Sequence, residues 1–236
     1  MQTLSDTFTT EDDARRAIIE TCLRMGRLGI NQGKSGNVSL RWDRGGAPGL
    51  LVTPTALAYE HMGPDDIVWI SIALDEASSP RPAMSDGTRA PSSEWRMHRD
   101  VYAERPEAQA VVHAHPVHAT TLACLPQVQR DGIPAFHYMI AVAGGADIRC
   151  APYASFGSVE LSRVALAALE DRRACLLGNH GLLVFHDALE RALDLAVEVE
   201  TLCRVYRQAL QLGAPVLIDA DEMARVVQRM RSGGYV

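Results

Sequence analysis

The sequence lacks the features that mark several large classes of protein. It contains no block of five like charges, and its formal net charge is −6, so a nucleic-acid-binding surface is not expected. No apolar run approaches the roughly 20 residues of a membrane-spanning helix, and the polar N-terminal stretch has no apolar segment typical of a secretion signal. We therefore expect a cytoplasmic protein with neither nucleic-acid nor membrane partners.

Cysteine pairs and aromatic residues are also scarce. The five cysteines are Cys22, Cys124, Cys150, Cys175 and Cys203. An odd number without a C-x-x-C pair favours free, buried thiols in a reducing compartment. Aromatic residues make up 6% of the chain and hydrophobic residues 47%, so Ala, Val and Leu must fill the core. The 236 residues are enough for one sizeable core, and we predict a single domain over residues 1–236.

Hydrophobic periodicity predicts helices and strands that alternate loosely along the chain. Helices are predicted at residues 9–30, 92–105, 118–125, 188–212 and 219–231. Strands are predicted at residues 37–42, 49–54, 66–72 and 108–115, and a strand pair around a turn at 174–186. The Ser- and Pro-rich stretch 75–93 is interpreted as a surface loop. The pattern indicates a layered α/β fold.

The stretch AVVHAHPVHATTLACL, residues 110–125, places histidines where a buried strand should carry apolar side chains. His113 and His115 are two residues apart, so their side chains lie on the same face of a strand. Such a pair is typical of a metal site, and His180, in a predicted turn, is a candidate third ligand. The alternative is a pair of hydrogen-bonded core histidines. For His118 we expect a packing or supporting role.

The remaining four histidines show no spacing typical of metal ligands, and we interpret them as surface or structural residues. They are His61, His98, His137 and His186.

Candidates for an anion site occur in three separate stretches. Ser92 and Ser93 precede a predicted helix that Glu94 opens, and a helix N-terminus attracts anions. The turn GKSGNVS adds Lys34 and Asn37, and VTPTALAYE places two threonines at a strand end. Ordinary helix capping and a solvated lysine are the alternatives. None of these stretches is a P-loop.

Four motifs occur in an order and approximate spacing that resemble the class II aldolase/adducin family, closest to its L-fuculose-1-phosphate aldolases. They are SSEWR, AVVHAHPVH, HYMIAVAGGADIRCAPYASFG and HGLL, and the resemblance extends from about residue 12 to 232. It implies a three-layer α/β fold, in which helices flank a central, mostly antiparallel sheet. It also implies a homotetramer with sites shared between subunits.

The resemblance also implies roles for individual residues. One Zn²⁺ per subunit would be held by His113, His115 and His180. Glu94 would be both a resting ligand and the catalytic carboxylate, and Tyr138 would reach the active site of a neighbouring subunit as a catalytic residue. Phosphate would be bound by Gly36, Asn37, Thr55, Ala56, Ser92 and Ser93.

The implied activity is reversible cleavage of a ketose 1-phosphate, such as fuculose 1-phosphate, to dihydroxyacetone phosphate and an aldehyde. Two alternatives within the family stay open. One is a 5-deoxyribulose or 5-methylthioribulose 1-phosphate aldolase of salvage metabolism, and the other is a sugar-phosphate 4-epimerase. A non-catalytic, adducin-like module is disfavoured because all three histidines and Glu94 are present.

This sequence departs from the aldolase pattern at four places. Lys34 stands where the aldolase has a threonine, and Ala56 where it has a glycine, so the backbone there must tolerate a side chain. Residues 75–91 form a longer loop, and Gly233 replaces a tyrosine for which Tyr235 is a possible substitute. Because the C-terminal tail is associated with the aldehyde end of the substrate, the identity of the aldehyde stays open.

Overall fold

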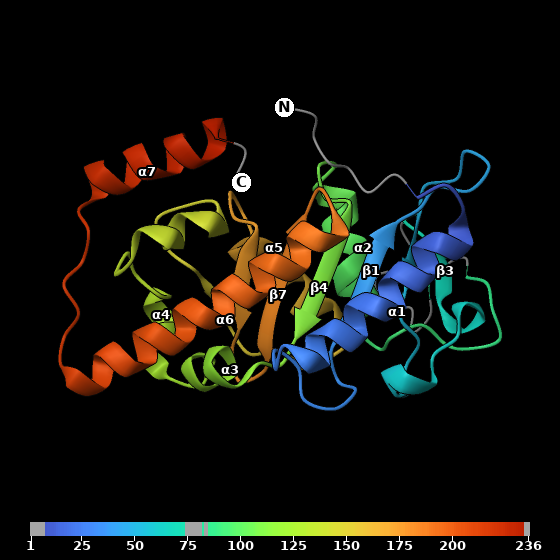
Figure 1. Cartoon of the computed structure of the whole chain (residues 1–236), viewed down its shortest axis with the longest axis horizontal. Helices are drawn as coiled ribbons and strands as arrows, with labels where there is room; N and C mark the ends of the chain where they lie inside the picture. Colours follow the sequence, from blue (N-terminus) through green and yellow to red (C-terminus); the bar gives the residue numbers. More distant parts are fainter. Residues whose placement is uncertain (1–7, 74–81, 83–84, 234–236) are drawn as a thin grey trace.

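A seven-stranded sheet forms the centre of the protein in a computed structural model that describes residues 8–73, 82 and 85–233 (Figure 1). The strand order is β3-β2-β1-β4-β7-β6-β5, and every neighbouring pair is antiparallel except β5–β6. The strands are β1 (Asn37–Arg41), β2 (Gly49–Val52), β3 (Val68–Ser71), β4 (Ala110–Ala114), β5 (Cys150–Ala151), β6 (Ala174–Leu177) and β7 (Gly181–His186). The predicted mostly antiparallel sheet is confirmed.

Helices cover both faces of the sheet, and this explains why several strands are apolar at every position. Along β4, Val112 packs into a core shared with α1 (Glu11–Arg27), α3 (Val117–Ala123) and α6 (Leu189–Leu212). Val111 packs into a second core, shared with α2 (Trp95–Glu104) and α5 (Val159–Ala168). The sheet therefore lies between two helical layers, as the sequence predicted.

Local signals account for the helix ends. Thr10 caps α1 through a reciprocal pair of hydrogen bonds with Asp13. The predicted apolar face of α6 is buried, and the helix has the predicted length within one residue. The helix predicted at residues 92–105 begins at Trp95, and Ser92 and Ser93 precede it, as predicted.

Three elements were not predicted: α4 (Pro126–Asp131), β5 and α5. The chain ends in α7 (Ala220–Ser232), and three short 3-10 segments, η1 (Tyr59–His61), η2 (Pro64–Asp66) and η3 (Tyr138–Ala143), complete the described elements. None of the described helices combines the length and apolarity that spanning a membrane requires.

All five cysteines are free, as predicted, and four of them are buried. Cys124 is exposed because it lies at the C-terminal end of α3, so the prediction of burial was wrong for this residue.

Candidate metal centre

Three parts of the fold bring the four predicted ligand residues together. Glu94 directly precedes α2, His113 lies on β4 with His115 just beyond its end, and His180 lies in the turn between β6 and β7. The candidate ligand atoms all lie within 4.8 Å of one another. Glu94 and His113 are buried, and His115 and His180 are partly exposed.

The three imidazoles each bring a ring nitrogen to within 4.8 Å of the others. The Nδ1–H of His113 donates to the Leu182 carbonyl at 2.7 Å, which leaves Nε2 of the neutral ring as an acceptor. This Nε2 lies 2.9 Å from Nε2 of His115, and each pair of the three rings has its centroids 4.8 Å apart. Facing lone pairs repel unless a proton or a cation lies between them, so the arrangement suits a cation.

The Glu94 carboxylate completes this group of donors. Its Oε2 lies 3.1 Å from Nε2 of His113, and its Oε1 lies 3.3 Å from Nε2 of His180. Oε1 is buried and has no hydrogen-bond partner among the described residues. A buried carboxylate oxygen without a partner is costly, and a divalent cation would satisfy it. Three imidazole nitrogens and one carboxylate oxygen form a donor set that zinc commonly binds.

Electrostatics favour an ionised Glu94 and neutral His115 and His180. Burial lowers the pKa of His113, but the adjacent Glu94 carboxylate outweighs it and raises this pKa above its usual value. Burial, together with repulsion from His113, lowers the pKa of His115 and of His180 to about 4. Burial alone would raise the pKa of Glu94, but the imidazoles of His113 and His180 and the Asn37 amide outweigh it and hold this pKa well below its usual range. An ionised Glu94 with neutral His115 and His180 matches what metal binding requires, and a bound cation would displace any proton held by His113.

Gly181 lets the turn that carries His180 approach the end of β4. A Cβ at this position would lie 2.3 Å from the Ala114 carbonyl oxygen and 2.9 Å from Cδ2 of His115. Both contacts are shorter than van der Waals packing allows. We infer that glycine here is required for the distance between His180 and the two β4 histidines.

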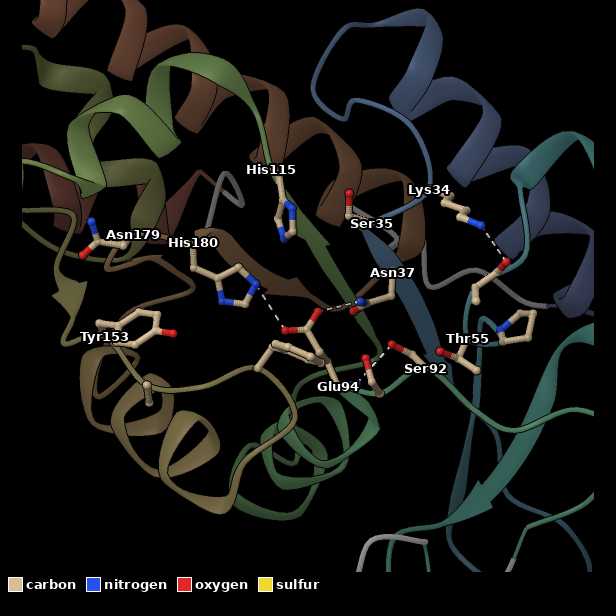
Figure 2. A pocket seen from close by; sticks show the side chains of 16 residues that line it. Lys34, Ser35, Asn37, Thr55, Ser92, Glu94, His115, Tyr153, Asn179 and His180 are labelled. Carbon is tan, nitrogen blue, oxygen red and sulfur yellow. Dashed lines mark hydrogen bonds and ion pairs between the residues drawn. The ribbon is translucent and has the colours of Figure 1, made fainter.

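A pocket of about 560 Å³ opens over the four-residue cluster. Figure 2 shows Lys34 and Thr55 on one side of Glu94, and Tyr153 and Asn179 on the other. All six residues predicted to bind phosphate line this pocket: Gly36, Asn37, Thr55, Ala56, Ser92 and Ser93. Lys34 also lines it, and its Nζ donates to the Ala56 carbonyl at 3.0 Å.

Several polar groups of these residues are already engaged in hydrogen bonds. The backbone N–H of Thr55 donates to Ala90, and that of Ser92 donates to Thr53. The side-chain amide of Asn37 donates to Oε2 of Glu94 at 2.9 Å. The hydroxyl groups, rather than these amides, are therefore what Thr55 and Ser92 can offer a ligand.

The two positions at which the sequence departs from the aldolase pattern near this pocket have structural consequences. Ala56 has a φ of 60°, in the left-handed region that glycine tolerates best. Lys34 brings a positive charge to the part of the pocket that Thr55 and Ser92 line. Tyr235 and residues 75–81, 83 and 84 of the longer loop lie outside the described residues.

Two predicted residues lie away from the cluster. Tyr138 begins η3, is 53% exposed and stacks on His137, and it is not among the described residues that line the pocket. His118 lies in the first turn of α3, which begins one residue before the predicted start, and donates its backbone N–H to Glu200.

Other residues near the cluster were missed in the sequence. Tyr153, Phe156 and Asn179 line the pocket. Asn31 accepts a hydrogen bond from the backbone N–H of His115 at 3.1 Å. Exposed aromatic residues in a Pro- and Gly-bounded stretch were the available signal for Tyr153 and Phe156, whereas no local pattern marks Asn31.

Comparisons with known proteins agree with this geometry. Residues 16–207 match the model of the class II aldolase and adducin N-terminal domain. A 5-methylthioribulose-1-phosphate/5-deoxyribulose-1-phosphate aldolase from Rhodospirillum rubrum is 46% identical over 220 residues, 93% of this chain and 92% of that protein. An L-fuculose phosphate aldolase from Escherichia coli is 44% identical over 93% of this chain and 94% of its own.

The fold comparison leads to the same family. A solved structure of an L-fuculose 1-phosphate aldolase superimposes with a TM-score of 0.83 at 36% identity, covering 93% of this chain and 96% of that one. With the family model matching most of its length, the chain belongs to the class II aldolase and adducin family.

Proposed function

We propose that this protein is a zinc-dependent aldolase that reversibly cleaves a deoxyketose 1-phosphate to dihydroxyacetone phosphate and an aldehyde. The observation that carries the proposal is the buried cluster of Glu94, His113, His115 and His180 at the wall of a pocket that also offers hydroxyl groups and Lys34. A phosphate bound beside Lys34, Thr55 and Ser92 would hold the substrate with its first carbons near the cluster.

The residues of the cluster suit the chemistry of carbon–carbon bond cleavage. A divalent cation held by the three histidines, and at rest by Glu94, would stabilise negative charge that develops on substrate oxygens. In the direction of synthesis, the ionised Glu94 would take the C3 proton of dihydroxyacetone phosphate when it is not serving as a ligand. Tyr138 of a partner subunit would give a proton to the new C4 alkoxide.

The far side of the pocket supports a substrate with an apolar end. Tyr153, Ala154 and Phe156 line it, and Phe156 is 72% exposed. Fuculose 1-phosphate, 5-deoxyribulose 1-phosphate and 5-methylthioribulose 1-phosphate all carry a methyl or methylthio end. The relatives' names contain these sugars, so the three compounds form the substrate set to test.

A coupled assay for dihydroxyacetone phosphate across these three compounds tests the proposal. Wild-type protein should contain one zinc per chain and cleave at least one of them. The variant His113→Ala should lose zinc and activity together. Exposed His61 provides the matched control, and His61→Ala should keep both. Full activity in zinc-free His113→Ala protein would contradict the proposal.

A further inference from the structure

Five buried side chains form a continuous array of hydrogen bonds that starts at Glu94 and Asn37 in the pocket wall and runs away from the pocket. Asn37 Nδ2 donates to Glu94 Oε2 at 2.9 Å, and Asn37 Oδ1 lies 2.5 Å from His98 Nε2. His98 Nδ1 lies 2.6 Å from Ser39 Oγ, which lies 2.9 Å from the Tyr102 hydroxyl. None of the five side chains belongs to a residue more than 5% exposed. We call these five residues the Glu94 array: Glu94, Asn37, His98, Ser39 and Tyr102.

The array forms because a helix and a strand present matching spacings. Glu94, His98 and Tyr102 are four residues apart, which places them along one face of α2 with a rise of about 6 Å per step. Asn37 and Ser39 are two residues apart on β1, with a rise of about 6.6 Å. The spacing of side chains along α2 nearly equals that along β1. Side chains of the strand and of the helix therefore alternate along the array.

Arg41 extends the same strand face and fixes the far end of the array. Its guanidinium donates to the Tyr102 carbonyl at 2.8 Å and lies over the Tyr102 ring, 5.0 Å from the centroid. Tyr102 is thereby held in place while its hydroxyl contacts Ser39. The array is anchored at both ends, by the cluster at Glu94 and by β1 at Arg41.

Each hydrogen bond in the Glu94 array has one possible direction. An ionised Glu94 only accepts, so the Asn37 amide must turn its NH₂ toward it and its oxygen toward His98. His98 must then carry its proton on Nε2. Burial, with repulsion from His113, lowers the pKa of His98 to about 3, so the ring is neutral and Nδ1 accepts from Ser39. Ser39 in turn accepts from the Tyr102 hydroxyl.

We propose that His98 is a positioning residue for Glu94: held by Ser39 and Tyr102 in the Nε2–H tautomer, it fixes the Asn37 amide so that Asn37 donates to Oε2 of Glu94. Without that N–H, the Asn37 oxygen has no donor and the amide is free to rotate, which weakens its hydrogen bond to Oε2 of Glu94. With it, the carboxylate keeps one orientation: Oε2 accepts from Asn37 and faces His113, and Oε1, which has no hydrogen-bond partner among the described residues, faces His180. The catalytic readouts of this proposal rest on the proposed aldolase function.

Two substitutions of the same buried side chain separate positioning from packing. His98→Phe keeps a ring of similar volume but removes the donor to Asn37. His98→Gln loses the ring but can place an amide N–H near the position of Nε2. Removing a partner behind a metal ligand typically reduces metal affinity or activity 10- to 100-fold. We expect His98→Phe to lose kcat and zinc affinity by about this factor with KM within about twofold, and His98→Gln to stay within about threefold of wild type.

The opposite ranking, with His98→Phe closer to wild type than His98→Gln, would show that the ring packs rather than positions and would overturn the proposal. Zinc affinity is measured by competition with a chelator, so this readout needs no substrate. If the wild-type protein cleaves none of the three ketose 1-phosphates, the proposed function fails while the ranking of zinc affinities still tests the role of His98.

A measurement on the wild-type protein covers the case in which His98→Phe does not fold. Long-range ¹⁵N–¹H NMR spectra distinguish the two imidazole tautomers, and His98→Gln identifies the His98 signals by their loss. We expect His98 in the Nε2–H form at pH 7, in both metal-free and zinc-loaded protein. An Nδ1–H tautomer or a protonated ring would reverse the direction of the array and overturn the proposal.

Discussion

At the scale of single residues, Glu94 differs from the other carboxylates of the described residues in its burial and in its neighbours. It is 4% exposed, it faces two imidazoles, and it accepts a hydrogen bond from Asn37. A surface carboxylate would be hydrated and mobile, whereas this one has a defined orientation and an ionised state held by its neighbours. Both properties suit a group that acts on a substrate proton.

Glu94→Gln keeps the volume of the side chain and removes its ability to take a proton. We expect turnover to fall about 10²-fold or more, the usual size of a general-base effect, while zinc is largely retained by the three histidines. Exchange of the C3 proton of dihydroxyacetone phosphate with solvent measures the step directly. Near-normal exchange in this variant would assign the base to another residue.

Ala56 has a backbone conformation that disfavours its side chain. A φ of 60° costs an alanine about 1–2 kcal/mol. Replacing it by glycine removes this cost but adds about 0.4–1 kcal/mol of unfolded-state entropy. We expect Ala56→Gly to raise the free energy of unfolding by about 0.5–1 kcal/mol, measured by urea denaturation.

Ala58 is the matched control for Ala56, because it is nearby and has an ordinary φ of −69°. At this position glycine relieves no backbone strain and only increases the conformational entropy of the unfolded chain. Ala58→Gly should therefore lower the free energy of unfolding by about 0.4–1 kcal/mol. Changes of the same sign in the two variants would show that the left-handed backbone at Ala56 is not strained.

At the scale of elements, α3 depends on a distant residue for its N-terminus. Its capping position is Pro116, which makes no side-chain hydrogen bond. The Glu200 carboxylate of α6 instead accepts the backbone N–H groups of His118 at 2.9 Å and Ala119 at 2.8 Å. A negative charge at a helix N-terminus is also favoured by the helix dipole.

Glu200→Ala leaves two N–H groups at the start of α3 without their acceptor. Hydrogen bonds to charged groups contribute about 1.5–3 kcal/mol, so we expect a loss of about 2 kcal/mol in the free energy of unfolding. Glu198 lies two residues away on the same helix and makes no hydrogen bond or ion pair with the rest of the described chain. Glu198→Ala should therefore change stability by less than about 0.5 kcal/mol. Equal losses in the two variants would contradict a capping role.

The sequence predicted the elements whose periodicity is strong. The apolar face of α6, the strand around His113 and the turn at His180 were all found, because each has its signal within a few neighbouring residues. β5 has only two residues, too few for an alternation to show. α5 was missed although Ser158 caps it. Its alanine-rich sequence has no clear helical or strand periodicity of apolar and polar residues.

The supporting contacts of the site could not be predicted in the same way. His98 and Asn37 are 61 residues apart, and their hydrogen bond exists only because α2 packs over β1. The spacing of His98 and Tyr102 on a helix was visible, but that spacing equally describes a packing face. The motif residues can be identified in the sequence alone. The residues that support them, such as His98, can be identified only from their contacts in the folded protein.

At the scale of the whole molecule, buried histidines make the stability of the metal-free protein sensitive to acid. Burial is the main cause that lowers the pKa of His98 to about 3 and those of His115, His180 and His186 to about 4. The unfolded chain titrates near pH 6.5, so it binds more protons below that pH than the folded chain does. Stability is therefore fully present above pH 6.5 and is lost as the pH falls toward 4.

Each such histidine contributes a slope of about 1.4 kcal/mol per pH unit between its two pKa values. His186 lies outside the cluster, so we expect His186→Gln to reduce the acid dependence of the unfolding free energy by about one histidine's share. The exposed His61 is the control, and His61→Gln should keep the wild-type slope. Urea denaturation at several pH values between 4 and 8 measures both, and parallel slopes in wild type and His186→Gln would contradict the expectation.

Sharing of sites between subunits can be tested by mixing inactive chains. Tyr138 is exposed and away from the pocket of its own chain, which fits a role in a neighbouring site. We expect Tyr138→Phe and His113→Ala proteins to be inactive alone and to regain activity when their subunits exchange, because some sites then combine an intact cluster with an intact tyrosine. No recovery, with exchange demonstrated by labelled subunits, would reject shared sites.

The order in which the ligands meet has a consequence for folding. The turn with His180 joins adjacent strands and can close early, whereas pairing of His113 with Leu183 joins positions 70 residues apart along the chain. Long-range pairings form late because their loops must close first. The cluster is thus complete only near the end of folding, and a bound metal should slow the unfolding reaction while leaving the folding rate almost unchanged. A bound metal would then increase the kinetic stability of the folded protein without guiding the folding reaction.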